Sequence, residues 1–364
     1  MQQAMRRPLT RRGWIAGSLA GSLQARQESG SVRFSRRIRV ALLGLDGHYG
    51  EILDPLPRLP DLDLVAASDP NRQNLARVVK SAGLGSTRLY SDYREMLERE
   101  QVDVVAVCNN NGERAEAVLA CAERKVNVIA EKPLAIERKD LERVRQAVRR
   151  HGIRLSMLLP MRFEPPYLAM KQLVDSGELG EVLQIAAQKS YKAGERPEWM
   201  RRHATYGGTI PWIGIHMIDL MRWASGREMT EVVSFQGHIG FPEIGDMENV
   251  TGSLFRLDNG GLGTLRMDYL RPETAPTHGD DRLRLAGTQG IAEYQQSTGV
   301  TVMTAGRKPE ALGKLPAARS VFVDFLESVY GGKPTALPLD DILRVNEIAL
   351  AARESAERGR IERL

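Results

Sequence analysis

Alternating strand-like and helix-like segments between residues 38 and 158 constrain the fold of this chain more than any other feature. Helix-start signals lie at Asn71 and Asp92, between the apolar runs. Strands that alternate with helices along a chain form parallel sheets, so this half is predicted to be an α/β domain with a parallel sheet. The strand-like runs cover residues 39–43, 62–67, 104–107, 126–130 and 154–158.

The second half has a different pattern. A predicted helix over 167–176 ends at Gly177, and successive strand-like runs follow without helices between them, which is typical of a largely antiparallel sheet in an α+β domain. The runs cover residues 182–190, 231–240, 250–257, 262–269 and 282–286, and helices are expected at 322–330 and 341–357.

A chain of 364 residues suits two domains of ordinary size. We expect a leader and linker over 1–37, a nucleotide-binding domain over 38–160 and a substrate-binding domain over 161–364. The last helices could pack back on the first domain.

Positive charge is concentrated at the N terminus. The formal net charge is +5, yet the first 39 residues contain nine arginines and one acidic residue, so the rest of the chain is slightly negative. A basic surface that could bind nucleic acid is therefore not expected on the folded body.

Residues 10–15 read Thr-Arg-Arg-Gly-Trp-Ile, and a weakly apolar segment runs on to Ala25. This pattern resembles a twin-arginine export signal and predicts a periplasmic protein. A disordered basic tail on a cytoplasmic protein is the alternative. The apolar segment is too short to span a bilayer, so no membrane anchor is expected.

The spacing of the cysteines and the lack of hydrolase motifs in the sequence argue against several functions. Cys108 and Cys121 are the only cysteines, and their spacing indicates neither a disulfide framework nor a metal site. The sequence contains no H-E-x-x-H and no G-x-S-x-G motif, so it does not favour a zinc or serine hydrolase.

A glycine-rich turn follows the first strand. Residues 44–50 read Gly-Leu-Asp-Gly-His-Tyr-Gly, a distorted form of the dinucleotide fingerprint G-x-G-x-x-G in which Asp46 occupies the second glycine position. Gly44 and Gly47 are expected to let the backbone approach a pyrophosphate. A glycine-rich turn that binds no nucleotide is the alternative.

Asp69 ends the second strand-like run. An acidic residue at this position binds the adenosine ribose hydroxyls of NAD and repels the 2′-phosphate of NADP, so NAD is the expected cofactor. The alternative is that Asp69 caps the following helix.

Glu131, Lys132 and Pro133 follow the fourth strand-like run. Ligands of open α/β sheets bind beyond the carboxyl ends of the strands, so Lys132 is expected to face a ligand.

Four spaced motifs together resemble the glucose-fructose oxidoreductase, inositol dehydrogenase and rhizopine-catabolism (Gfo/Idh/MocA) family over residues 38–364. They are Glu131-Lys132-Pro133, Gly177-Glu178-Leu179-Gly180-Glu181, Gly207-Gly208 with His216 and Asp219, and Gly287-Thr288-Gln289-Gly290. The resemblance implies a Rossmann domain that binds NAD, followed by a substrate domain.

The resemblance also implies roles for individual residues. Lys132 would bind the substrate hydroxyl and move its proton during hydride transfer, with His216 as its acid/base partner. Glu131, Asn109 and Asn111 would lie on the nicotinamide side of the cofactor site.

The chain departs from the family pattern at Trp212, where the family usually has an aspartate four residues before the histidine. We expect Trp212 either to offer a flat surface to a sugar ring or to pack in the core. Arg162 and Tyr191 are the other expected substrate contacts.

These features predict an NAD-dependent oxidoreductase acting on a sugar, polyol or sugar derivative, assembled as a homodimer or homotetramer. A glycosidase or lyase that oxidises its substrate transiently and a non-catalytic nucleotide-binding homologue are the alternatives. The sequence does not identify the substrate or the direction of the reaction.

Overall fold

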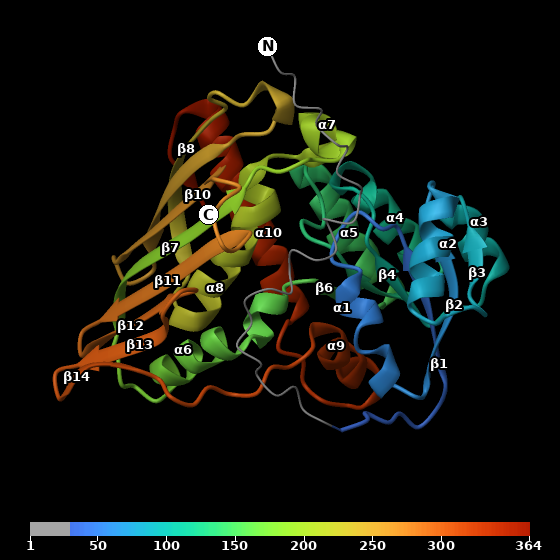
Figure 1. Ribbon diagram of the computed structural model, residues 1–364, viewed down its shortest axis with the longest axis horizontal. Helices are drawn as coiled ribbons and strands as arrows, with labels where there is room; N and C mark the ends of the chain where they lie inside the picture. The colour runs from blue at the N-terminus through green and yellow to red at the C-terminus, as the bar shows by residue number, and fades with distance from the viewer. Residues whose placement is uncertain (1–29) are drawn as a thin grey trace, which may run out of the picture.

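The computed structural model describes residues 30–364; the predicted twin-arginine leader lies outside these residues (Figure 1). The first domain contains a six-stranded parallel sheet in the order β3-β2-β1-β4-β5-β6. Its strands are β1 (Ile38–Leu43), β2 (Leu62–Ser68), β3 (Arg88–Tyr90), β4 (Val104–Val107), β5 (Asn127–Ala130) and β6 (Leu155–Met157).

Helices connect these strands, as the alternation predicts. They are α1 (Gly50–Leu53), α2 (Arg72–Ser81), α3 (Tyr93–Arg99), α4 (Asn111–Glu123) and α5 (Arg138–His151). The predicted caps are confirmed, because Asn71 accepts a hydrogen bond from the backbone of Asn74 and Asp92 accepts one from Arg94. All four residues of β4 are buried, as expected for a central strand of a parallel sheet.

The second domain contains a nine-stranded sheet in the order β14-β13-β12-β11-β7-β10-β9-β8-β15. Every pairing in it is antiparallel except that of β7 with β10, so the predicted largely antiparallel sheet is confirmed. Its strands are β7 (Val182–Lys192), β8 (Met229–Gly237), β9 (Val250–Leu257), β10 (Leu262–Arg271), β11 (Gly279–Gly287), β12 (Gly290–Gln295), β13 (Gly299–Thr304), β14 (Arg307–Ala311) and β15 (Glu362–Arg363).

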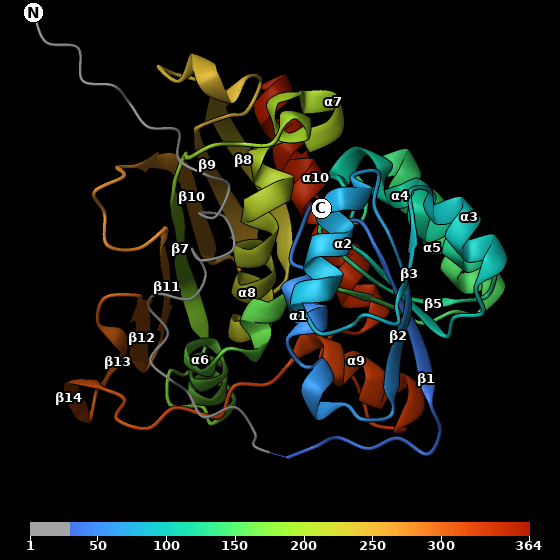
Figure 2. The same ribbon diagram turned by 45° about the vertical axis from the view of Figure 1, so that its right-hand side comes forward.

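Helices of the second half fill the space between the two sheets (Figure 2). They are α6 (Pro165–Asp175), α7 (His203–Tyr206), α8 (Ile215–Ser225), α9 (Val321–Tyr330) and α10 (Leu339–Arg358). α8 packs on β7, β10 and β11, whereas α10 contacts both β8 of the second sheet and β6 of the first. α9 reaches the first domain, where it contacts α1 and Tyr330 donates a hydrogen bond to the carbonyl of Asp103 over 3.2 Å.

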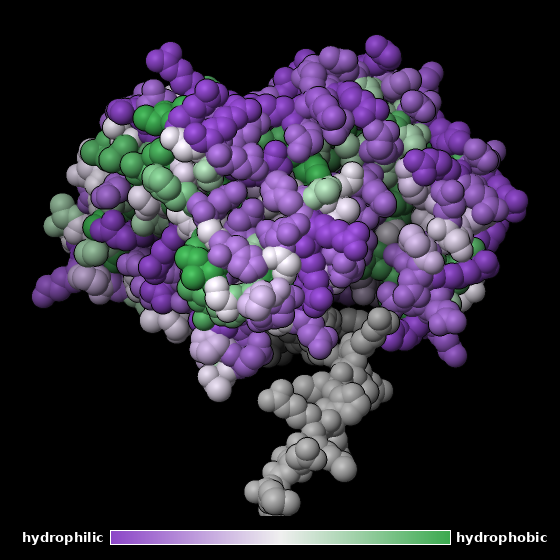
Figure 3. All heavy atoms as spheres, turned by 90° about the horizontal axis from the view of Figure 1, so that it is seen from above, coloured by the Kyte–Doolittle hydropathy of each residue, from purple (hydrophilic) through white to green (hydrophobic). Residues whose placement is uncertain are grey.

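None of the helices within residues 30–364 is long and apolar enough to cross a membrane. Seen from above, the surface is mostly hydrophilic, and its hydrophobic residues are most evident at the end formed by the large sheet (Figure 3).

Candidate functional site

The carboxyl ends of four parallel strands bring the predicted site residues together at one edge of the first sheet. Gly44 follows β1, Asp69 follows β2, Asn109 lies just beyond β4, and Glu131 and Lys132 follow β5. Parallel strands place these ends at the same edge. The expected grouping of these residues is therefore present in the structure.

The glycine turn packs directly on this edge. Gly44 has a φ of +82°, and a Cβ atom there would lie 2.6 Å from the backbone of Asn109. A Cβ at Gly47 would overlap the side chain of Glu131. Gly44 is required for its backbone conformation, and at both positions the neighbouring atoms leave no room for a Cβ atom.

Asp69 fixes the glycine turn relative to α2. Its carboxylate accepts hydrogen bonds from the backbone of Leu45 over 2.9 Å and of Asn71 over 2.7 Å. Asn71, and not Asp69, caps α2. Each carboxylate oxygen of Asp69 keeps a further lone pair that a ribose hydroxyl could use.

Glu131, which was expected among the cofactor contacts, is fully buried beneath the glycine turn. One oxygen accepts hydrogen bonds from the backbone and from Nδ1 of His48, the latter over 2.6 Å, and the other accepts from the backbone of Lys132. Burial opposes the charge, but His48 lowers the pKa of Glu131 well below its usual range. Glu131 therefore holds the turn and the lysine in place.

Asn109 and Asn111 have different surroundings. Both polar side-chain atoms of Asn109 are buried without a hydrogen-bond partner among residues 30–364, so they are available to a ligand. Asn111 is occupied, because its amide donates to the carbonyl of Tyr206 over 2.7 Å and its oxygen accepts from Arg114 over 2.9 Å. Asn111, which was predicted to contact the cofactor, thus links the two domains through these hydrogen bonds.

Lys132 is 1% exposed and lies against Trp212. Its Nζ donates to the carbonyl of Trp212 over 3.1 Å and lies 3.1 Å from the centre of the indole ring. Burial lowers the pKa of Lys132 to about 7, with the charges of Arg114 and Lys189 adding to the effect and Glu131 opposing it. The peptide bond from Lys132 to Pro133 is cis.

Trp212 is enclosed rather than open to the cleft. It is 8% exposed, and the rings of Trp199 and Tyr206 lie 5.4 and 6.4 Å from its centre. Of the two expectations for Trp212, packing in the core agrees with this burial, and the ammonium of Lys132 occupies the indole face. Residues 210–214 form a π-helical turn before α8, a feature common at functional sites.

His216 lies in the first turn of α8, next to the glycine turn. Its ring packs edge-on against that of His48, with centroids 5.9 Å apart, and its Nδ1 is buried without a partner in the described chain. Burial and the charge of Lys132 lower the pKa of His216 well below 6.5, so the imidazole is neutral at physiological pH. Trp212, which contacts Lys132, lies four residues before His216, so both predicted acid/base residues lie near the start of α8.

Arg162, which was predicted to bind substrate, is engaged in buried ion pairs. Its guanidinium makes a two-pronged ion pair with Asp219 at 2.8 and 2.5 Å, and also bonds to Asp341 at 3.1 Å. This pair is almost fully buried and joins the start of the second domain to α8 and α10. Arg162 is structural.

Tyr191 lies on the covered face of the large sheet, near Lys189, whose Nζ is 5.2 Å from the tyrosine ring. His278 packs on the same ring at 5.1 Å. The position agrees with a substrate contact. The sequence did not indicate four further functional candidates: Lys189, Asp281, Glu164 and His48. The first three lie outside the recognised motifs. His48 lies within the glycine-rich turn, at a position where the dinucleotide fingerprint specifies no residue.

The edge of the first sheet fits a dinucleotide, with one exception. Gly44, Gly47 and Asp69 suit the pyrophosphate and ribose, and the unpaired amide of Asn109 suits the nicotinamide side. The exception is Asp46, which lies in the glycine turn and whose pKa is raised to about 6 by burial and by the charge of Asp69. A partly protonated Asp46 repels a pyrophosphate less than a full carboxylate would.

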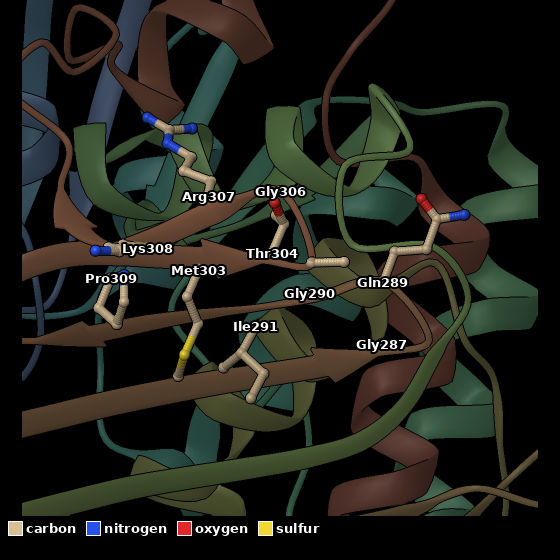
Figure 4. Close-up of a pocket in the computed structure, with 11 residues that line it drawn as sticks. Gly287, Gln289, Gly290, Ile291, Met303, Thr304, Gly306, Arg307, Lys308 and Pro309 are labelled. Atoms are coloured by element: carbon tan, nitrogen blue, oxygen red, sulfur yellow. The ribbon is translucent and has the colours of Figure 1, made fainter.

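Another hollow lies at the far edge of the large sheet, on β12–β14 (Figure 4). Its one arginine, Arg307, is paired with Glu310 and with Glu178. Its one lysine, Lys308, is exposed, and no histidine, cysteine, tyrosine or acidic residue of the described chain lines the hollow, so it is not the candidate site. Among residues 30–364, no cluster of His, Cys, Asp or Glu could hold a metal ion.

Family models match both halves of the chain. Residues 38–159 match the oxidoreductase family with an NAD-binding Rossmann fold, and residues 167–293 match the GFO/IDH/MocA C-terminal domain.

Full-length relatives agree with this match. The chain is 26% identical to myo-inositol 2-dehydrogenase of Thermotoga maritima, over 90% of this chain and 98% of that protein. It is 24% identical to the NAD-dependent scyllo-inositol 2-dehydrogenase of Bacillus subtilis, over 89% of this chain and 95% of that one.

Solved structures show the same fold. An oxidoreductase from Thermotoga maritima has a TM-score of 0.85 and 30% identity, with 90% of this chain and 100% of that one covered. Levoglucosan dehydrogenase, solved with NADH and levoglucosan, has a TM-score of 0.78 at 18% identity, with 90% of this chain and 99% of that one covered.

Proposed function

Because this chain belongs to the Gfo/Idh/MocA family of NAD-binding oxidoreductases, we propose that it interconverts a secondary alcohol and a ketone on a sugar or cyclic polyol, with Lys132 and His216 handling the hydroxyl proton. One observation carries the proposal: a buried lysine and a buried neutral histidine lie together where the cofactor edge of the first sheet meets α8. The names of the inositol dehydrogenase relatives support the substrate class.

The proton chemistry follows from the charge states of these two residues. NAD, when bound, supplies the hydride acceptor. Hydride leaves a carbinol carbon readily only if the oxygen loses its proton, and a lysine with a pKa of about 7 is half neutral at pH 7 and can accept it. The neutral His216 can hydrogen-bond the same oxygen without adding charge.

The test is Lys132→Met, which keeps most of the volume of the side chain but removes the proton-handling group. We expect the rate of polyol oxidation to fall about 10²- to 10⁴-fold. NADH affinity, measured by fluorescence titration, and the melting temperature should change little. The matched control is Lys80→Met on the exposed side of α2, which should leave the rate unchanged.

Assays of this variant and of the unmodified enzyme distinguish the proposed function from its alternatives. Activity of Lys132→Met within a few-fold of the unmodified enzyme would show that the lysine is structural. Glycoside cleavage without net NADH formation would instead indicate a hydrolase or lyase, and turnover of any sugar or polyol excludes a non-catalytic homologue.

We also propose export of the folded protein, on the strength of Arg11 and Arg12 ahead of a weakly apolar segment. Replacing both arginines by lysine should retain the protein in the cytoplasm. Cell fractionation measures this, and an unchanged periplasmic level in the double variant would refute the proposal.

A further inference from the structure

The covered face of the large sheet changes from apolar to polar along two neighbouring strands. Antiparallel pairing places Ala187 opposite Leu283, and two residues further along it places Lys189 opposite Asp281. Side chains two residues apart lie on the same face of a strand, so all four belong to the face covered by the helices. The change of polarity marks where the apolar core of the second domain ends.

Lys189 and Asp281 form a cross-strand ion pair that leaves one carboxylate oxygen unsatisfied. Lys189 is 1% exposed, and its Nζ lies 2.7 Å from Oδ2 of Asp281. Oδ1 of Asp281 is buried and has no hydrogen-bond partner in residues 30–364. A buried carboxylate oxygen is costly to leave without a donor, so this atom is suited to accept a hydrogen bond from a ligand.

The pair lies on the strands that pack against the helix of His216. Lys189 is on β7 and Asp281 on β11, and α8 contacts both strands. The charge of Lys189 also contributes to the lowered pKa of Lys132 and His216. Burial works against the charge of Lys189, but Asp281 raises the pKa of Lys189, which therefore stays cationic. Asp281 thus lies on the face of the large sheet that is turned toward α8.

A second carboxyl group lies near the pair. Glu164 precedes α6, and its backbone donates a hydrogen bond to the carbonyl of Met161, whose sulfur lies 3.4 Å from Nζ of Lys189. Burial together with the charge of Asp281 raises the pKa of Glu164 to about 7. The positive charge of Lys189 is thus already balanced by Asp281, and a further acidic group lies near it. A ligand carboxylate would meet acceptors and negative charge here, whereas a hydroxyl group could donate to Asp281.

We propose that Asp281, supported by Lys189 and Tyr191, is the subsite that binds hydroxyl groups of an uncharged polyol away from the reacting carbon, and that it selects against sugar acids. The proposal rests on the proposed function and adds to it the charge class of the substrate. Asp281 binds substrate directly, and Lys189 positions the carboxylate.

The test compares Asp281→Asn with the unmodified enzyme on four probes: myo-inositol, D-glucose, D-glucuronate and D-glucosamine. The amide is isosteric, but it removes the charge that strengthens the hydrogen bond. For the best neutral probe we expect KM to rise about 10- to 100-fold with kcat changed only a few-fold. Discrimination against glucuronate should decrease, and NADH affinity should not change.

Two further variants guard against an indirect effect. Asp281→Asn leaves the charge of Lys189 buried without its partner, so this variant could have a lower melting temperature. The double variant Lys189→Met/Asp281→Asn removes both charges. It should show the same loss of affinity for the neutral probe. Glu310→Gln breaks an ion pair at the exposed edge of the same sheet and should leave every KM unchanged.

The outcomes separate this proposal from the proposed function. Probe binding to the NADH-loaded protein, read from the cofactor fluorescence, tests the subsite even if turnover is absent. An unchanged affinity for the neutral probe in folded Asp281→Asn, no neutral probe bound at all, or a preference for glucuronate or glucosamine would overturn the subsite. Retained turnover in Lys132→Met would overturn only the proton-transfer role.

Discussion

Lys132 lies beside Trp212, which stands at the position where the family usually has an aspartate, and this difference affects the pKa of the lysine. A carboxylate beside a lysine raises the pKa of the amine, whereas an indole ring attracts the ammonium more weakly. Burial lowers the pKa of Lys132 to about 7, and its neighbour Trp212 carries no negative charge that would raise it. Much of the lysine is therefore neutral at physiological pH and ready to accept a proton.

This arrangement predicts a defined pH dependence. Oxidation needs neutral Lys132, so kcat/KM should be low below pH 6, rise through about pH 7 and level off above it. Trp212→Leu removes the attraction that favours the ammonium, worth about 0.5–2 kcal/mol, so the rise should move about 0.4–1.5 pH units toward acid.

Trp212→Phe is the matched variant, because it keeps an aromatic face. Its pH profile should lie between those of Trp212→Leu and the unmodified enzyme. A profile that moves toward alkaline pH in Trp212→Leu, or does not move at all, would contradict the assigned role of the indole.

At the scale of elements, the turn between β1 and α1 depends on its contact with β5. Gly47→Ala would force a methyl group into the side chain of Glu131. We expect a loss of about 1–3 kcal/mol in the free energy of unfolding, as is usual for overpacking, together with weaker NADH binding because the turn must shift. Urea denaturation and fluorescence titration measure the two effects.

Gly85→Ala serves as the control, since this exposed glycine between α2 and β3 has nothing within 4 Å of an added Cβ. It should leave both quantities close to those of the unmodified protein. Equal effects at the two positions would show that Glu131 does not support the turn.

The parts that the sequence predicted are those governed by local patterns. β4 was predicted residue for residue, because its apolar run is bounded and buried on both faces. β3 was missed because it has three residues, and β14 because it is an exposed edge strand containing Pro309.

The sequence predicted the positions of those site residues that follow directly after a strand. It did not predict the tertiary contacts of the others. Gly44, Asp69 and Lys132 lie as expected because parallel strands align their ends. The partners of Arg162 and Asn111 lie 57 and 95 residues away, so no local pattern could reveal that these side chains are already engaged.

At the scale of the whole molecule, the outer face of the large sheet exposes hydrophobic residues. Phe235 on β8 is 73% exposed, and Leu254 on β9 is 41% exposed; both line a shallow hollow on this face. Such groups on a sheet face are typical of an interface. We therefore expect a homo-oligomer, and Phe235→Asp should shift it toward monomer in light scattering.

Ile361→Asp is the control for this prediction. Ile361 is 61% exposed but does not line the hollow. This variant should keep the mass of the unmodified protein, and an identical response of both variants would argue against the outer face as the interface.

α10 has a consequence for how such a protein can be cut and recombined. Asn346 accepts a hydrogen bond from the backbone of Leu134 over 2.8 Å, and Arg353 donates to the carbonyls of Ile136 and Gly207 over 2.7 and 3.0 Å. The segment directly after the reactive lysine is thus held by the last helix of the chain. Separating the chain near residue 160 would leave the nucleotide-binding half without this support, so the half is not a transferable module: a chimera must carry α10 along with it.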